Sequence, residues 1–184
     1  MATVKLVRPR VSYADLERSP EDDRRYELYD GEVFVVPAPL PRHQVVQMLI
    51  VELLRGYARA GGGCVLDSPI EVVFSEFDVL QPDVLFFKAE RAHLVDLDAP
   101  IRHAPDLCVE VLSPSTAAAD RGRKLQMYAR YAVPEYWVVD PAGRLEIHEL
   151  TPRGYTLAFA AGAGDDVQSP TLAGLTFSVR SVLP

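Results

Sequence analysis

The sequence lacks the features of a membrane protein and of a small protein that is stabilised by zinc or by disulfide bonds. It has only two cysteines, Cys64 and Cys108, in strand-like stretches without paired ligand spacing. We therefore expect reduced core thiols rather than a zinc site or a disulfide. No apolar run approaches the roughly 20 residues that span a bilayer, and the opening stretch MATVKLVRPR has no apolar segment of signal-peptide length. These absences predict a soluble, cytoplasmic protein with no membrane partner.

Basic residues are fewer than acidic residues. The chain has 19 Lys and Arg against 26 Asp and Glu, a formal net charge of −7. Proteins that bind nucleic acid through non-specific phosphate contacts usually carry a basic footprint. The acidic balance weakens a nucleic-acid hypothesis without excluding it, because a metal ion held by converging carboxylates could reverse the sign of the local field.

The length and composition predict one globular domain. The chain has 184 residues, of which 48% are hydrophobic and 24% are charged. This length suits a single packed core and is short for two. We expect one domain over residues 1–184, with its core at about residues 26–150 and a C-terminal tail at residues 160–184 that packs against it.

Hydrophobic periodicity predicts both helices and strands. A long helix is expected over residues 42–60, ended by three glycines, and a second helix over residues 117–131. On the long helix a second face carries polar side chains that we expect to be solvated, namely His43, Gln47, Glu52 and Arg55. A hairpin around Asp30-Gly31 and a loop over residues 75–82 are expected, with strands at residues 64–67, 70–74, 83–87, 107–112, 135–140, 144–150 and 155–159. This order favours an α/β (α+β mixed) fold with a curved antiparallel or mixed sheet and the long helix on one face.

The run LCVEVL contains one carboxylate, Glu110, among apolar residues. Burying a carboxylate costs several kcal/mol unless a cation or a metal compensates it. Glu110 is therefore a candidate site residue. A place at the exposed end of the sheet, or a structural ion pair with an arginine, remains an equal alternative.

Asp83 opens another apolar strand, and the two strands would bring Asp83 and Glu110 to the same end of a sheet if they were neighbours. Carboxylate oxygens suit Mg²⁺ or Mn²⁺, and the backbone carbonyl of Val111 is a further candidate ligand. Lys124 follows on the next helix, where it could assist at a scissile phosphate. The alternative for Lys124 is a surface ion pair with Asp120 at i,i+4 spacing.

An ordered set of motifs carries a family resemblance. The set comprises YEL from Tyr26, DGE from Asp30, Pro82-Asp83, EVLSPS from Glu110, Lys124 with Tyr128, and VPEYWVVDP from Val133. Over roughly residues 26–150 it resembles the Uma-type family of predicted endonucleases, within the PD-(D/E)xK restriction-endonuclease-like superfamily.

The resemblance implies a mixed β-sheet flanked by helices and a metal-dependent endonuclease that uses Mg²⁺ or Mn²⁺. The superfamily's catalytic residues are an Asp, an acid on the next strand and a lysine two residues later. Asp83 and Glu110 match the two acids, whereas Leu112 stands at the lysine position. Uma-type proteins place a lysine on the following helix, so Lys124 is the implied substitute.

Further site residues are expected from the same resemblance and from charge. An additional acid from an early element is implied, for which Glu27 is favoured over Glu32. His43, at the start of the long helix, could face the same cleft. Arg121 and Arg123 flank Lys124 and are candidate phosphate contacts, together with His43 as a possible nucleic-acid contact.

Two functions of different classes are consistent with the sequence. The first is a metal-dependent endonuclease that hydrolyses phosphodiester bonds in DNA or a related nucleic acid. The second is a catalytically inactive nuclease-like fold that binds nucleic acid or a protein, which Leu112 and the net charge of −7 motivate. A homodimer is the default expectation for an enzyme that cuts two strands.

Overall fold

The computed structural model describes residues 9–20 and 22–184, and its largest sheet is mixed. The six strands of this sheet are, in spatial order, β10 (Gly154–Gly162), β9 (Arg144–Thr151), β8 (Glu135–Asp140), β7 (Leu107–Val111), β6 (Val84–Phe87) and β3 (Cys64–Asp67). Strands β7 and β8 are parallel, and every other neighbouring pair is antiparallel. The predicted fold class, a mixed sheet flanked by helices, is confirmed.

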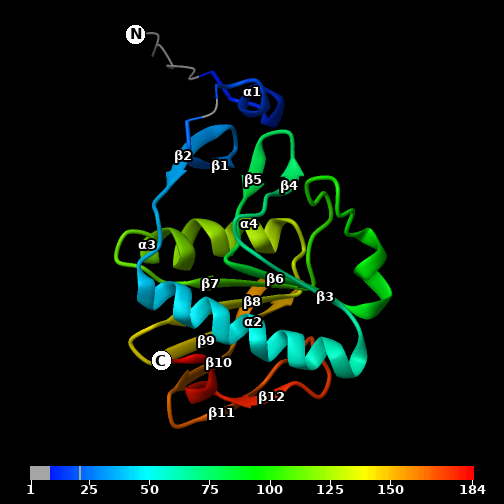
Figure 1. Ribbon diagram of the computed structural model, residues 1–184, viewed down its shortest axis with the longest axis vertical. Coiled ribbons are helices and arrows are strands. Elements are labelled where there is room, and N and C mark those ends of the chain that lie inside the picture. The colour runs from blue at the N-terminus through cyan, green and yellow to red at the C-terminus, as the bar shows by residue number, and fades with distance from the viewer. Residues whose placement is uncertain (1–8, 21) are drawn as a thin grey trace.

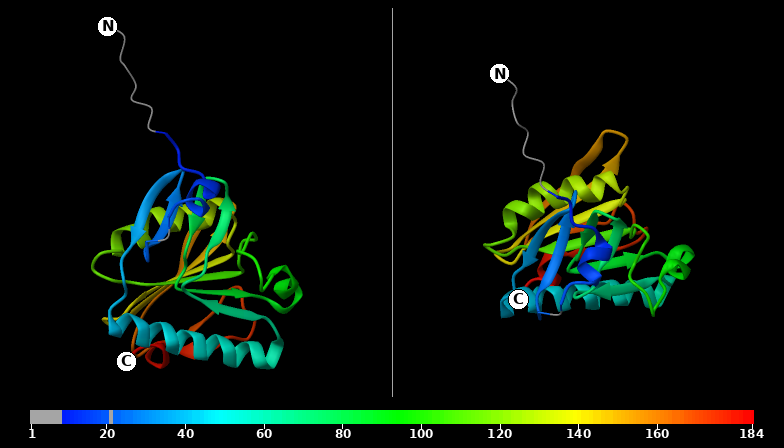
Figure 2. Two further views of the ribbon diagram at one scale, coloured as in Figure 1. Left: turned by 45° about the horizontal axis from the view of Figure 1, so that its top comes forward. Right: turned by 90° about the horizontal axis from the view of Figure 1, so that it is seen from above.

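Helices cover both faces of this sheet (Figures 1 and 2). The long helix α2 (Pro41–Gly61) lies on one face, and on the other lies a helix in three parts, α3 (Ala117–Ala119), the π-helical turn η2 (Asp120–Lys124) and α4 (Leu125–Arg130). Alternate side chains of β7 point to opposite faces of the sheet, and each face has its own hydrophobic core. Val109 and Val111 pack with the α2 side, whereas Cys108 packs with the α4 side. Glu110 follows the same alternation as Cys108 and faces the helix that carries Lys124.

Helix α2 matches the predicted span within one residue at each end. Val46, Ile50 and Leu54 form its buried stripe, and the glycines after it end the helix as expected. Gly63 has φ +116°, and a Cβ there would lie 2.6 Å from the Phe86 ring, so no other residue fits without a shift.

The prediction of a solvated second face on α2 is wrong for its first two turns. His43 and Gln47 are 8% and 2% exposed, whereas Glu52 and Arg55 are exposed as expected. The amide of Gln47 donates to Ser68 Oγ at 3.2 Å, so this part of the helix packs polar side chains against the loop after β3.

A second, four-stranded antiparallel sheet stands beside the first, and the sequence did not predict it. Its strands are, in spatial order, β2 (Glu32–Val36), β1 (Arg25–Tyr29), β5 (Asp78–Leu80) and β4 (Val72–Ser75). The hairpin β1–β2 is confirmed, but the expected loop over residues 75–82 contains β5, and β4 does not join β3 and β6 in one sheet. A strand of three residues is too short to give a periodic signal.

The remaining elements complete the cores. Helix α1 (Tyr13–Glu17) starts at Ser12 with a capping box that Asp15 completes, and η1 (Ala89–Leu94) follows β6. The C-terminal segment forms β11 (Asp166–Gln168), β12 (Thr176–Ser178) and η3 (Val179–Val182), whose buried side chains join the core on the α2 side. Among the described residues, no helix has the length and apolar character needed to cross a membrane.

Candidate active site

The register of the large sheet brings Asp83 and Glu110 together. Val84 of β6 lies opposite Val109 of β7, so the residues one step further along, Asp83 and Glu110, meet where β6 begins and β7 ends. The Asp83 carboxylate accepts a 2.7 Å hydrogen bond from the Val111 amide, which holds it across this strand pair.

Glu110 is 3% exposed and is paired with a lysine on the helix opposite. Lys124 Nζ donates to Glu110 Oε1 at 2.8 Å, and the hydroxyl of Tyr128, one helical turn further, donates to the same oxygen at 2.7 Å. Lys124 is itself 6% exposed. The pair is therefore buried, and the alternatives of an exposed strand end and a surface ion pair are wrong.

Two more carboxylates surround the Lys124 ammonium. Glu27 Oε1 of β1 lies 3.1 Å from Nζ, and Asp120 Oδ1 lies 3.8 Å from it. Both are buried, at 5% and 1% exposure, whereas Glu32 is exposed on β2. Of the two early acids, Glu27 is the one at the cluster. Asp120 was expected only as a surface partner of Lys124, and the signal that could have found it is the helical spacing that puts it on the same inward face.

The π-helical turn η2 places Asp120 and Lys124 on the buried side. A π turn adds one residue to a helical turn, and such turns are frequent at functional sites. Asp120 and Lys124 begin and end η2, and both are buried, whereas Arg121 and Arg123 between them are exposed. The same turn therefore supplies a carboxylate and an ammonium group to the interior and two guanidinium groups to the surface.

The cluster has more negative than positive charge. Burial raises the pKa of Glu110 well above its ordinary range, the Lys124 ammonium lowers it, and the carboxylates of Asp83, Asp120 and Glu27 raise it further. Burial also raises the pKa of Asp120. For Lys124, burial alone would lower the pKa, but Glu110 and the other acids hold it well above the ordinary value, so the lysine stays protonated.

His43 from α2 contacts the other side of Asp83. His43 Nε2 lies 3.1 Å from Asp83 Oδ2, and its Nδ1 is buried with no hydrogen-bond partner among the described residues. The Asp83 carboxylate is thus held by an imidazole from one helix and by the Val111 amide from the neighbouring strand. His43 therefore contacts Asp83, while its role at the site stays a prediction.

The oxygen donors of this cluster are of the type that binds divalent cations. Over residues 9–20 and 22–184, no three His, Cys, Asp or Glu side chains are already arranged around one point as metal ligands, because the Lys124 ammonium takes the place where the acids converge. Both carboxylate oxygens of Asp120 are nevertheless buried without a hydrogen-bond partner in the described part of the chain. Unpaired carboxylate oxygens beside Glu110 are the donors that hard cations prefer.

The two arginines beside Lys124 differ in what holds them. Arg121 is paired with Glu146 of β9 at 3.0 Å. Arg123 has no ion pair among the described residues, and its guanidinium stacks on the Phe34 ring at 3.9 Å and on the Tyr29 ring at 4.9 Å. Cation–π contacts leave the guanidinium N–H groups available. Of these two arginines, Arg123 is thus the one that no acid of the described residues engages.

Two cavities flank the turn at residues 113–116. One, of about 140 Å³, is lined by Glu27, Asp120, Arg123 and Lys124 and opens between β2 and the helix. The other, of about 410 Å³, lies on the opposite side of the turn and is lined by His43, Leu112 and neighbouring residues. The acid cluster therefore has an opening of its own and a second cleft beside it.

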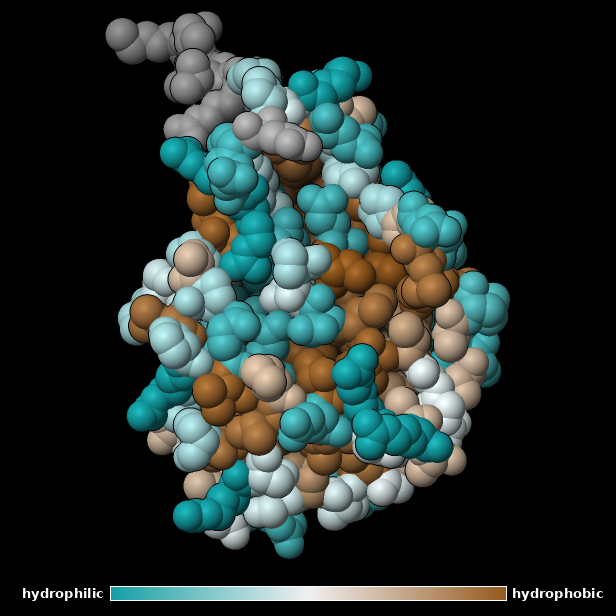
Figure 3. All heavy atoms as spheres, in the orientation of Figure 1, coloured by the Kyte–Doolittle hydropathy of each residue, from teal (hydrophilic) through white to brown (hydrophobic). Residues whose placement is uncertain are grey.

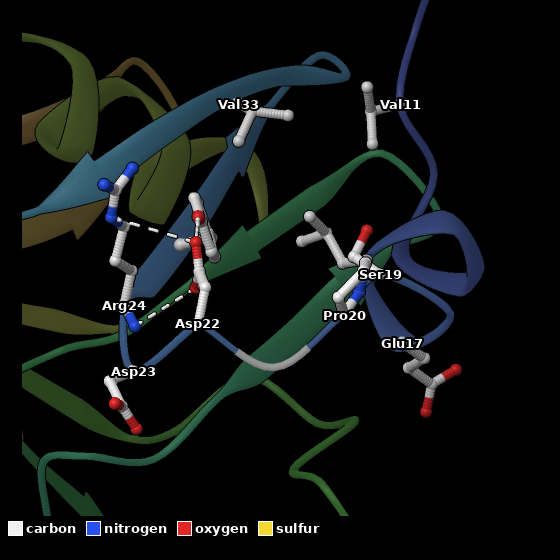
Figure 4. A pocket seen from close by; sticks show the side chains of 10 residues that line it. Val11, Glu17, Ser19, Pro20, Asp22, Asp23, Arg24 and Val33 are labelled. Atoms are coloured by element: carbon white, nitrogen blue, oxygen red, sulfur yellow. Dashed lines mark hydrogen bonds and ion pairs between the residues drawn. The ribbon is translucent and has the colours of Figure 1, made fainter.

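A cavity larger than either of these lies elsewhere. It measures about 800 Å³ and lies between α1 and the β1–β2 hairpin (Figure 4). Its acids do not converge: Figure 4 shows Asp22 against Arg24, while Glu17 points away. This cavity holds no buried cluster of titratable groups and is not a candidate active site.

Known proteins share this architecture and sequence pattern. The crystal structure of a protein from Anabaena variabilis, described as "a putative nuclease belonging to DUF820", superposes with a TM-score of 0.76 over 94% of this chain and 97% of that chain, at 17% identity. The uncharacterised protein slr1290 of Synechocystis sp. is 27% identical over 183 residues, which cover 93% of this chain and 90% of the relative. The Uma2 family model, described as "Putative restriction endonuclease", matches residues 12–180. The chain therefore belongs to the Uma2 family.

Proposed function

We propose that this protein is a metal-dependent endonuclease that hydrolyses phosphodiester bonds in DNA or a related nucleic acid, with Mg²⁺ or Mn²⁺ as its cofactor. The observation that supports the proposal is the convergence of Glu27, Glu110 and Asp120 on the buried ammonium of Lys124, with Asp83 adjoining Glu110, in a member of a restriction-endonuclease family. Restriction-endonuclease-like proteins generally use divalent metals.

Asp83 and Glu110 are the residues that would hold the cation, with the Val111 carbonyl as a third oxygen donor. When bound, the metal supplies a Lewis acid for the phosphate and lowers the pKa of a bound water. His43 and the Val111 amide fix the orientation of Asp83 before any ligand arrives. Such outer contacts commonly set the affinity of a metal site.

Lys124 acts as a fixed positive charge rather than as a base. Its surrounding carboxylates raise its pKa well above the ordinary value, so it has no free lone pair with which to accept a proton. A protonated amine beside the reacting phosphate stabilises the negative charge that develops there. Glu27 and Asp120 keep the amine in place from two further sides.

Cleavage assays with single variants test this proposal. Asp83→Asn, Glu110→Gln and Glu27→Gln should each abolish or strongly reduce cleavage of DNA in Mg²⁺ or Mn²⁺. Glu32→Gln is the matched control, because Glu32 is exposed on the strand next to that of Glu27 and lies outside the cluster. Metal-dependent cleavage that persists unchanged in Asp83→Asn and Glu110→Gln would show that another site is responsible.

A second candidate function is a nuclease-like fold that binds nucleic acid or a protein without cleaving it. Two observations favour it: Leu112 stands where the superfamily has its lysine, and the Lys124 ammonium already neutralises part of the acid cluster. Titration calorimetry with Mn²⁺ separates the two functions. Saturable binding that Glu110→Gln removes supports the enzyme, whereas no binding at millimolar metal by the folded protein supports the binding module.

A further inference from the structure

The cleft of about 410 Å³ beside the acid cluster has walls of two kinds. Leu112, Pro114 and Ala117 supply apolar lining, and Arg42, His43 and Arg121 supply its polar part. Its volume lies within the range of pockets that enclose small organic ligands. The cavity on the other side of the turn is about 140 Å³ and is lined by charged groups, so the two cavities suit different parts of one ligand.

The cleft adjoins the proposed reaction centre at His43. The His43 ring lines the cleft, and its Nε2 lies 3.1 Å from the Asp83 carboxylate. The turn at residues 113–116 separates the two cavities by one layer of backbone, because Ser113 and Pro114 line the cleft while Ser115 and Thr116 line the smaller cavity. A ligand group in the cleft is therefore a direct neighbour of a group at the acid cluster.

The charges around the two cavities indicate which part of a nucleotide each would take. Arg123 is stacked on aromatic rings and lines the smaller cavity, where its guanidinium, unlike the ammonium of Lys124, is not engaged by a carboxylate of the described residues and is the cation open to a phosphate. In the larger cleft Arg121 is engaged by Glu146, and the Asp140 carboxylate caps its own turn at the Ala142 amide. That leaves a mainly apolar surface with Arg42 at its edge, which suits a base and a sugar better than a second phosphate.

We propose that this cleft is a nucleoside subsite, which receives one unpaired nucleoside next to the phosphate that is cleaved. The inference rests on the proposed endonuclease function and names its substrate class as single-stranded or locally unpaired nucleic acid. A base can enter the cleft only when it has left the stack of its duplex, and unstacking costs a few kcal/mol in paired DNA. The net charge of −7 agrees with a substrate held at a few local contacts rather than along a broad basic surface.

Two pairs of variants test the subsite. Leu40 lines the cleft and Met48 does not, yet both are on or next to α2 and both are 63% exposed. Leu40→Glu adds a negative charge at the cleft, and Met48→Glu adds the same charge to the same helix away from it. In the second pair, Ala117→Phe fills the cleft, and Ala118→Phe adds the same bulk to an exposed neighbour that does not line it. Because Leu40 and Met48 are exposed, the first pair of variants still tests the subsite if Ala117→Phe does not fold.

The probe is a short, fluorescently labelled single-stranded DNA oligonucleotide, titrated in EDTA so that no cleavage occurs. Leu40→Glu and Ala117→Phe should weaken its binding by about tenfold or more, a change of about 1.4 kcal/mol. Met48→Glu and Ala118→Phe should bind as the natural protein does. All four variants should keep Mn²⁺ binding in calorimetry. A duplex of the same sequence should bind more weakly than the single strand.

The outcomes separate this inference from the function on which it rests. Equal binding by Leu40→Glu and Met48→Glu, or a preference for the duplex, overturns the nucleoside subsite even if the protein cleaves DNA in a Glu110-dependent manner. If the natural protein binds neither oligonucleotide and cleaves neither in Mn²⁺, both the endonuclease and the subsite are overturned. Loss of oligonucleotide binding in the cleft variants, with Mn²⁺ binding retained, supports both.

Discussion

Lys124 donates a 2.8 Å hydrogen bond to Glu110, which lies 14 residues earlier on the central strand of the sheet. Glu110 alone would be a buried carboxylate with a large desolvation cost, and Lys124 alone would be a buried ammonium. Each therefore makes the burial of the other possible. The pair also fixes the distance between β7 and the helix opposite, so the site and the packing of the fold depend on the same contact.

Removing the Lys124 charge should destabilise the protein and should make its stability depend on metal. Lys124→Met leaves Glu27, Glu110 and Asp120 buried without a cation, and breaking a buried pair in this way costs about 3–5 kcal/mol. Mn²⁺ should raise the melting temperature of Lys124→Met by more than it raises the melting temperature of the natural protein. Thermal denaturation with and without Mn²⁺ measures both effects. Lys88→Met, away from the cluster, serves as control, and equal Mn²⁺ shifts in all three proteins would contradict the prediction.

The pH dependence of stability should reveal the buried acid. Burial raises the pKa of Glu110 well above its unfolded value, so the folded state binds this proton more tightly than the unfolded state does. The stabilisation is present below the unfolded pKa of about 4.3 and is lost as the pH rises through the folded pKa. Glu110→Gln has no such proton, so its unfolding free energy should fall less between about pH 4 and about pH 8. Urea unfolding in EDTA checks this, and parallel pH profiles would refute it.

Arg123 and Arg121 should contribute unequally to nucleic-acid binding. Arg123 is stacked on Phe34 with its N–H groups available, whereas Arg121 is paired with Glu146. Arg123→Ala should weaken binding of single-stranded DNA and reduce the slope of log K against log salt by about 0.7, the loss of one phosphate contact. Arg121→Ala should change the slope little. Fluorescence titrations at several salt concentrations measure the slopes, and a larger effect of Arg121→Ala would reverse the assignment.

His43 should tune the metal affinity without being essential for the fold. The imidazole is one of two groups that hold the Asp83 carboxylate, and loss of such an outer contact typically costs 10–100-fold in metal affinity. His43→Ala should therefore weaken Mn²⁺ binding by about that factor. Calorimetry provides the measurement, with His103→Ala, at an exposed position, as control. Unchanged Mn²⁺ affinity in His43→Ala would mean that the Val111 amide alone positions Asp83.

Much of the fold could be predicted from local sequence patterns. The apolar runs that form β3, β7, β8 and β9 are strong signals, and three glycines mark the end of α2. The four-stranded sheet was missed because β5 has three residues and pairs with β1, about fifty residues earlier in the chain. The polar face of α2 was misjudged for a different reason. Helical spacing places His43 and Gln47 on the same face as Ile50 and Leu54, and only the polar character of the two side chains suggested that they would be exposed. Their contacts with Asp83 and Ser68 satisfy these polar groups in the folded chain.

The candidate site was predictable in its residue types but not in its electrostatics. Motif order pointed to Asp83, Glu110 and Lys124, and the register of β6 and β7 places the two acids side by side. Asp120 was weighed only as a surface partner of Lys124, because i,i+4 pairs on helices usually face water. Helical spacing puts Asp120 on the same face as Lys124 and Tyr128, but the π-helical turn that buries Asp120 and Lys124 has no local sequence signal.

The π-helical turn also makes the site sensitive to chain length as well as to residue identity. Point substitutions at Gly122 meet open space, since an added Cβ there has no atom within 4 Å. Deletion of that one residue would instead remove the extra residue of the π turn, so that Asp120 and Lys124 would be three positions apart rather than four. Their side chains would then lose the relative placement on the buried side that the π turn gives them. A deletion in this segment therefore disturbs the site more than a point substitution at Gly122 does.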